Sequence, residues 1–128
     1  MVDASFVVQA STTAEGLRRL RGRRAIAPPL LWSETTSVLH EMRWRGVISN
    51  ALADIALENF ARAAISRRQP RQLLERAWTI ANDFGWAKTY DAEYVALAEL
   101  VGCPLLTLDA RLALRVADRV EVLRPADI

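Results

Sequence analysis

Apolar and polar positions follow two patterns along this chain of 128 residues. Short, almost continuously apolar runs occur at residues 2–8, 25–27, 103–108 and 120–124. Such runs are typical of strands that are covered on both faces. Between them lie longer segments in which apolar residues recur every three or four positions, as they do on one face of a helix. This alternation predicts an α/β fold, a three-layer α/β/α sandwich with a mostly parallel central sheet.

Capping residues and prolines indicate where the predicted helices begin. Thr12 and Glu15 form a capping-box pattern at the start of one segment. Pro28 and Pro29 suit the first turn of the next helix. The segments predicted as helices are 12–21, 28–46, 50–67, 70–85, 89–102 and 109–117. The joint at 65–72 is the least regular of these segments and is also compatible with a loop.

Length and hydrophobicity limit the class of protein. A single domain over residues 1–128 accounts for the whole length, and a domain of this size can bury a sizeable core. No apolar stretch approaches the roughly 20 residues that span a bilayer, and residues 1–10 lack the basic start of a signal peptide. We therefore expect a soluble, cytoplasmic protein that does not associate with membranes.

Arginine dominates the basic residues. The chain has 17 basic residues against 15 acidic ones, a net charge of +2, and Lys88 is the only lysine. A guanidinium group offers a planar fork of donors that suits phosphate oxygens. A GC-rich genome would also enrich arginine, together with alanine. The basic cluster at 18–24 is therefore either a solvated helix end or a nucleic-acid contact, and the sequence leaves both interpretations open.

Several kinds of catalytic site are absent from the sequence. Cys103 is the only cysteine and lies in an apolar run, so it is expected to be a small core residue. His40 has no cysteine and no second histidine with which to bind zinc. No P-loop, GxGxxG, CxxC, HExxH or GxSxG pattern occurs. Carboxylates are the remaining candidates for chemistry.

Four carboxylates lie within apolar patterns or at the ends of predicted helices and strands. Asp3 interrupts an apolar run, where a charge is costly to bury unless it is paired or binds a cation. Glu34 is flanked by apolar positions of a helix, so its stem is expected to lean toward the sheet. Asp91 begins a helix, where the helix dipole favours its ionised form. Asp109 directly follows an apolar run, at the carboxyl end of a predicted strand, where α/β proteins place their sites. Each acid also has an ordinary explanation as a cap, turn or surface residue.

The segments that carry these acids resemble, in order along the chain, the PIN-domain family. The resemblance is greatest to the VapC ribonuclease toxins of bacterial toxin–antitoxin pairs. The similar segments are MVDASFVV, LLWSETTSVL, TYDAEYVALAELVGCPLLTLDARL and VEVLRP. The pattern DAxYxALA around Asp91 and the pattern TxD around Asp109 are the most specific. Residues 43–88 are similar only in helical texture, and residues 110–113 offer no fifth acid such as some relatives carry.

The resemblance implies a Mg²⁺-dependent endoribonuclease, the toxin of a type II toxin–antitoxin pair. Two carboxylates about 4 Å apart repel by about 4 kcal/mol at an effective dielectric constant of about 20, so converging acids need protons or a cation. Mg²⁺ is the expected ion, and Mn²⁺ would fit the same oxygen ligands. Asp3, Asp91 and Asp109 would coordinate the metal directly or through water, and Glu34 would join them or orient the attacking water. All four would be catalytic residues.

The resemblance also implies partners and supporting residues. The partners are an RNA substrate, a small antitoxin protein and a second copy of the chain in a homodimer. Ser5 and Thr107 match hydroxyl positions near the acids of the family and would support those acids or be structural. Trp32 and Trp44 could line a groove for the antitoxin or the second copy.

Two alternative functions stay open. The chain could be an inactive or regulatory PIN-fold binding module, or a PIN nuclease that acts on other nucleic acid without an antitoxin. A phosphorelay receiver domain is excluded, because it would need an acidic pair at the end of the first strand, where Asp3 stands alone, and a lysine after its last strand.

Overall fold

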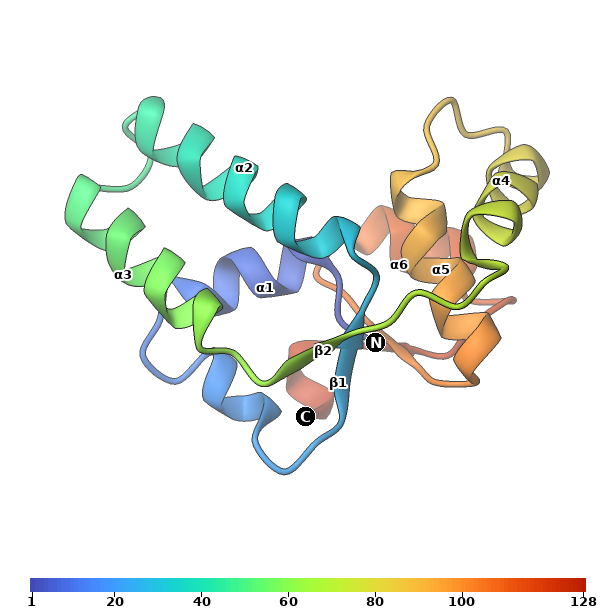
Figure 1. Cartoon of the computed structure of the whole chain (residues 1–128), viewed down its shortest axis with the longest axis horizontal. Helices are drawn as coiled ribbons and strands as arrows, with labels where there is room; N and C mark the ends of the chain where they lie inside the picture. The colour runs from blue at the N-terminus through green and yellow to red at the C-terminus, as the bar shows by residue number, and fades with distance from the viewer.

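The computed structural model describes residues 1–128 and places six helices in two groups around a small sheet (Figure 1). The helices are α1 (Ala4–Ser11), α2 (Leu30–Trp44), α3 (Asn50–Ala61), α4 (Leu73–Phe84), α5 (Tyr90–Val101) and α6 (Ala110–Val116). The strands are β1 (Ala25–Ala27), β2 (Ile65–Arg67), β3 (Leu105–Leu106) and β4 (Val122–Leu123). Two 3₁₀ turns are η1 (Leu17–Leu20) and η2 (Pro125–Asp127). None of the helices combines the length and the apolar character needed to cross a bilayer.

All strand pairings are parallel, as the sequence predicts. β1 pairs with β2, and β3 pairs with β4. Val2 joins the two pairs, because its N–H donates to the carbonyl of Ile26 at 3.0 Å and it forms a parallel bridge with Leu106. The order across the sheet is therefore β2, β1, Val2, β3, β4. Since the strands are parallel, their carboxyl ends lie along one edge.

The prediction of a strand over residues 2–8 is wrong beyond Val2. The chain turns into α1 because Asp3 is the N-cap of that helix: its carboxylate accepts a hydrogen bond from the N–H of Phe6 at 3.0 Å. Phe6 and Val7 are buried as core residues of a helix rather than of a strand. A short apolar run fits a buried helix as well as a buried strand, so the pattern alone does not separate them.

Two predicted helices are also wrong in part. Residues 12–21 contain turns and η1 in place of a continuous helix. The helix predicted over 50–67 ends at Ala61, and its last residues form β2. The strand predicted at 25–27 is confirmed with the same bounds, and the other predicted helices and strands are confirmed with shorter bounds. The overall prediction of an α/β fold with a parallel sheet is confirmed.

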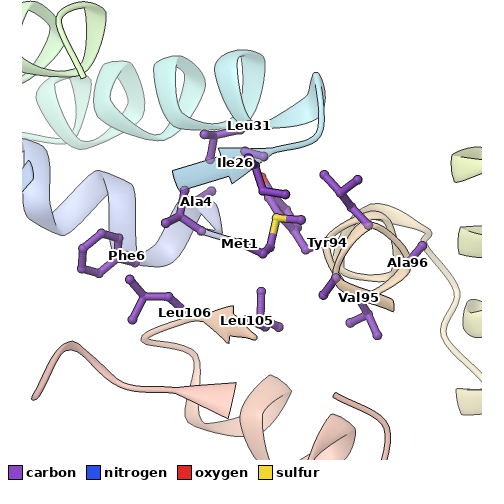
Figure 2. Close-up of a cluster of buried hydrophobic side chains, with 14 of the residues drawn as sticks. Met1, Ala4, Phe6, Ile26, Leu31, Tyr94, Val95, Ala96, Leu105 and Leu106 are labelled. Atoms are coloured by element: carbon purple, nitrogen blue, oxygen red, sulfur yellow. The ribbon is translucent and has the colours of Figure 1, made fainter. Parts of the chain in front are cut away.

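One cluster of 27 buried apolar residues forms the core (Figure 2). The cluster combines the start of the chain with α1, β1, β3 and α5. α5 is the most buried helix, and its buried residues are Ala92, Tyr94, Val95, Ala96, Leu97 and Ala98. Residues 94–98 of α5 are all buried, so the middle of the helix is packed on every side, while its more exposed first turn lies at the edge of the sheet near the candidate site.

Candidate active site

Asp3 is the most buried of the four predicted acids, with 4% of its surface exposed. Its Oδ1 accepts hydrogen bonds from the N–H of Phe6 at 3.0 Å and from the hydroxyl of Ser5 at 2.8 Å, and its Oδ2 accepts one from Thr107. Burial raises the pKa of Asp3, these three hydrogen bonds lower it, and the charge of Asp109 raises it further. The hydrogen bonds hold the Asp3 carboxylate in one orientation.

Ser5 and Thr107 connect Asp3 with Asp109. Their hydroxyl oxygens lie 3.2 Å apart. The N–H of Leu108 donates to Oγ of Ser5 at 2.9 Å, and the N–H of Asp109 donates to Oγ1 of Thr107 at 2.9 Å. The two hydroxyls thus tie the start of α1 to the loop that follows β3. This is the place predicted for them beside the acids.

Asp109 is the N-cap of α6. Its Oδ1 accepts hydrogen bonds from the N–H groups of Arg111 at 2.8 Å and Leu112 at 3.0 Å. These contacts fix the carboxylate at the start of the helix. Oδ2 has no hydrogen-bond partner in the protein, so this oxygen is available to a ligand.

Glu34 points from α2 toward α5. Its Oε2 accepts a hydrogen bond from the hydroxyl of Tyr94 at 2.6 Å. Burial raises the pKa of Glu34, the Tyr94 bond lowers it, and the charges of Asp91 and Asp3 raise it. Burial and the same bond raise the pKa of Tyr94, so its hydroxyl is a donor at neutral pH.

Asp91 lies in the first turn of α5. Burial raises its pKa, the charge of Asp109 raises it further, and the charge of Arg115 lowers it. Arg115 on α6 donates to the carbonyl of Phe84 at 3.0 Å, and its guanidinium carbon lies 5.2 Å from the centre of the Trp86 ring. A positive side chain therefore lies close enough to Asp91 to lower its pKa.

The four predicted acids converge at the carboxyl edge of the sheet. Asp109 raises the pKa values of Asp3 and Asp91, and both of those acids raise the pKa of Glu34. Carboxylate oxygens are the ligands that Mg²⁺ prefers, so the donor set fits a divalent cation. No group of three or more acidic, histidine or cysteine side chains is close enough to ligate one ion directly. Since Mg²⁺ usually keeps several waters, ligation partly through water suits this spacing.

The sequence did not predict three of the residues at the site. They are Glu93, whose pKa is raised by burial and by the charge of Glu34, together with Tyr94 and Arg115. A signal for Tyr94 was present, because it follows Asp91 by three residues and so shares a face of α5 with it. No spacing pattern indicated Arg115.

Other candidates from the sequence lie elsewhere. The cluster at 18–24 precedes β1 and lies at the amino edge of the sheet, away from the acids. His40 lies on the exposed face of α2, and Cys103 packs against the core. Trp32 and Trp44 both line a groove along α2, and Trp44 is 80% exposed. Neither tryptophan belongs to the acidic cluster.

The fold is shared with a protein of known structure. The crystal structure of PAE2754 from Pyrobaculum aerophilum matches with a TM-score of 0.69 at 23% sequence identity, covering 96% of this chain and 87% of that one. At this level of identity the likeness concerns the fold alone.

Comparison of sequences gives closer relatives. Ribonuclease VapC9 of Mycobacterium tuberculosis is 36% identical over 114 residues, covering 88% of this chain and 87% of that protein. Ribonuclease VapC3 of the same organism is 35% identical over 118 residues, covering 88% of this chain and 84% of that protein. The family described as PIN domain matches residues 1–119. The chain therefore belongs to the PIN-domain family.

Proposed function

We infer that this protein is an endoribonuclease, and we propose that it is the toxin of a type II toxin–antitoxin pair that uses Mg²⁺ or Mn²⁺. The observation that carries the proposal is the convergence of Asp3, Glu34, Asp91 and Asp109 at one edge of the sheet. Relatives named ribonucleases, at 35% and 36% identity, support RNA as the substrate.

The acids divide into two proposed roles. A bound divalent cation supplies positive charge that acidifies water and neutralises the charge developing on the phosphate. Asp3, Asp91 and Asp109 would hold the ion directly or through water, with the free Oδ2 of Asp109 as one donor. Glu34 keeps Oε1 free and has a raised pKa, so it can orient the attacking water and accept its proton.

Arg115 supplies positive charge at the rim of the cluster. Because Phe84 and Trp86 hold its guanidinium in place, it can meet a phosphate of the RNA strand without leaving these contacts. An antitoxin protein and a second copy of the chain remain proposed partners, and the groove along α2 that includes Trp32 and Trp44 is a candidate surface for either.

Cleavage of RNA by the purified protein, freed of any partner, tests this function. Cleavage should require Mg²⁺ or Mn²⁺ and stop with a chelator. Asp91→Asn and Asp109→Asn should each lower kcat by at least about 100-fold, because each removes a ligand charge from the site. Asp54→Asn is the matched control: Asp54 lies on α3, with 74% of its side chain exposed, and should keep full activity.

Three outcomes would change the proposal. Undiminished cleavage by both site variants would contradict the assignment of the acids. A wild-type protein that binds RNA but does not cleave it with either metal would favour a binding module. Expression of the chain alone should arrest growth, and coexpression of the neighbouring gene should relieve the arrest. Harmless expression in the native host, with no copurifying partner, would contradict the toxin role.

A further inference from the structure

The hydrogen bond between Tyr94 and Glu34 joins the two sides of the acidic site. Tyr94 is 1% exposed, and Figure 2 shows its side chain extending from α5 toward Ile26 of β1. Its hydroxyl lies 2.6 Å from Oε2 of Glu34, and this is the only side-chain hydrogen bond between α2 and α5. The bond therefore sets where the Glu34 carboxylate lies relative to α5.

The Tyr94 hydroxyl donates to a site carboxylate and not to the backbone. A buried tyrosine needs a hydrogen-bond acceptor for its hydroxyl, and a backbone carbonyl would satisfy that need. Here the acceptor is instead the carboxylate of Glu34, which lies on α2, 60 residues before Tyr94 in the chain. Tyr94 lies one turn after Asp91, so the same face of α5 that presents Asp91 also holds Glu34.

Without this bond, electrostatic repulsion would favour movement of the Glu34 carboxylate out of the cluster. Asp91 and Asp3 repel its charge, and no other hydrogen bond restrains its carboxylate. A glutamate side chain has several rotatable bonds, so repulsion would turn it toward solvent. The Tyr94 bond opposes that movement and occupies Oε2, which leaves Oε1 as the oxygen that can face water or an ion.

We propose that Tyr94 is a positioning residue, whose hydroxyl fixes the Glu34 carboxylate in the acidic cluster with one oxygen free. The role rests on the proposed function of the cluster. Tyr94 itself does not touch the substrate. It acts through Glu34, as outer partners of site carboxylates do, and loss of such partners typically costs 10- to 100-fold in activity or metal affinity.

The variant Tyr94→Phe tests the proposal, because it removes one oxygen atom and keeps the buried ring. We expect kcat for RNA cleavage to fall at least about 10-fold, with KM for RNA within about twofold. In the absence of RNA, the Mn²⁺ concentration that gives half of the maximal rise in melting temperature should increase several-fold, because a Glu34 carboxylate that has left the cluster no longer adds its negative charge beside the ion. This second measurement does not depend on activity.

Ser11→Ala is the matched control. Ser11 is also fully buried, and its hydroxyl donates to the carbonyl of Val7 at 2.6 Å at the far end of α1 from Asp3. The control should lower the melting temperature and leave kcat and the Mn²⁺ response unchanged. If Tyr94→Phe behaves in the same way, the residue is only structural and the proposal is wrong.

A double-mutant cycle separates positioning from a direct effect. In a Glu34→Gln background, Tyr94→Phe should cause no further fall in kcat, because the residue that it positions is already lost. A further 10-fold fall would overturn the proposal. If the wild type fails to cleave RNA, the proposed function fails, and the Mn²⁺ titration of Tyr94→Phe against wild type still decides the positioning role.

Discussion

Thr107 illustrates how one hydroxyl supports a buried charge. It is 2% exposed, donates to Oδ2 of Asp3 and accepts from the N–H of Asp109. A hydrogen bond to a charged group contributes roughly 1.5–3 kcal/mol, and an unsatisfied buried charge costs more than an unsatisfied neutral group. Thr107 is therefore one of three donors, with Ser5 and the N–H of Phe6, that offset the cost of burying Asp3.

Replacing Thr107 by valine should destabilise the protein and raise the pKa of Asp3 further. We expect Thr107→Val to lower the free energy of unfolding at pH 7 by about 1.5–3 kcal/mol, because the charged Asp3 loses a donor. The loss should shrink at low pH, where Asp3 is protonated in both proteins. Urea unfolding at pH 7 and at acidic pH measures both effects.

Thr35→Val provides the comparison for that measurement. Thr35 is also fully buried, but its hydroxyl has no hydrogen-bond partner. Removing this hydroxyl should be neutral or stabilising, since no bond is lost and an unsatisfied polar group disappears. Equal changes in the free energy of unfolding for Thr107→Val and Thr35→Val would mean that the bond from Thr107 to Asp3 contributes nothing to stability.

The sequence predicted the four acids because each departs from its local pattern or begins an element. No local rule indicates Arg115, and the spacing of Tyr94 from Asp91 shows only that the two residues share a face of α5. Tyr94 looks like an ordinary core residue of a helix until the helix that carries Glu34 is placed beside it, 60 residues away in the chain. Contacts between elements distant in sequence are what a single sequence does not show.

At the scale of elements, the start of the chain was the hardest to predict. Only Val2 in this region pairs with a strand, and a single paired residue gives no periodic pattern in the sequence. The apolar residues that follow belong to α1, and the cap that begins this helix is Asp3, one of the site acids. The longer helices, with glycines Gly85 and Gly102 at their ends, were predictable because the signals extend over several turns.

Gly16 is a second feature of this region that the sequence does not reveal. A Cβ built on Gly16 would lie 2.1 Å from the carbonyl oxygen of Ala10 and 2.6 Å from Oγ1 of Thr13. Its φ of −54° is accessible to any residue, so the constraint is space and not backbone conformation. The close approach lets the chain leave α1 and reach η1 by a short turn.

Gly16→Ala should therefore lower the free energy of unfolding by about 1–3 kcal/mol through overpacking. The control is Gly22→Asn, where φ is +76° and nothing lies within 4 Å. Asparagine tolerates this left-handed conformation, so its cost should stay below about 1 kcal/mol. Thermal unfolding of both variants compares them, and an unchanged melting temperature for Gly16→Ala would contradict the packing described here.

At the scale of the whole molecule, the site lies where two groups of helices meet. Figure 1 shows α1, α2 and α3 on one side of the sheet and α4, α5 and α6 on the other. Asp3 and Glu34 belong to the first group, and Asp91 and Asp109 to the second. Repulsion between these acids therefore opposes the joining of the two groups unless a cation or protons neutralise it.

Acidification should stabilise the metal-free protein. The folded-state pKa values of Asp3, Glu34 and Asp91 are raised, so the folded state binds protons more tightly than the unfolded state. The tighter proton binding of these three carboxyl groups stabilises the folded state fully below their ordinary pKa values, 3.8 for aspartate and 4.5 for glutamate. This stabilisation is lost as pH rises through the raised pKa values. In chelator, melting temperature should rise as pH falls from 7 toward that window, and Mg²⁺ should stabilise the protein at pH 7.

Asp91→Asn should melt at or above the wild type in chelator and respond less to Mg²⁺, because it removes a repelled charge that caps no helix. Glu75→Gln is the control, since Glu75 occupies the first turn of α4 and is exposed. This control should keep the full Mg²⁺ response. A drop in melting temperature for Asp91→Asn, with no Mg²⁺ effect on wild type, would mark Asp91 as an ordinary helix-start residue.

The pairing of Val2 between β1 and β3 has a consequence for the order of events during synthesis. Asp3 reaches its partner Thr107 across 104 residues, and the strand beside Val2 ends at Leu106. Contacts of such long range form late, because the intervening chain must first be closed into a loop. A ribosome that has made α1, α2 and α3 has therefore not yet made an assembled acidic site. With Asp109 in its proposed role, the nascent chain should acquire nuclease activity only after residue 109 has left the ribosome.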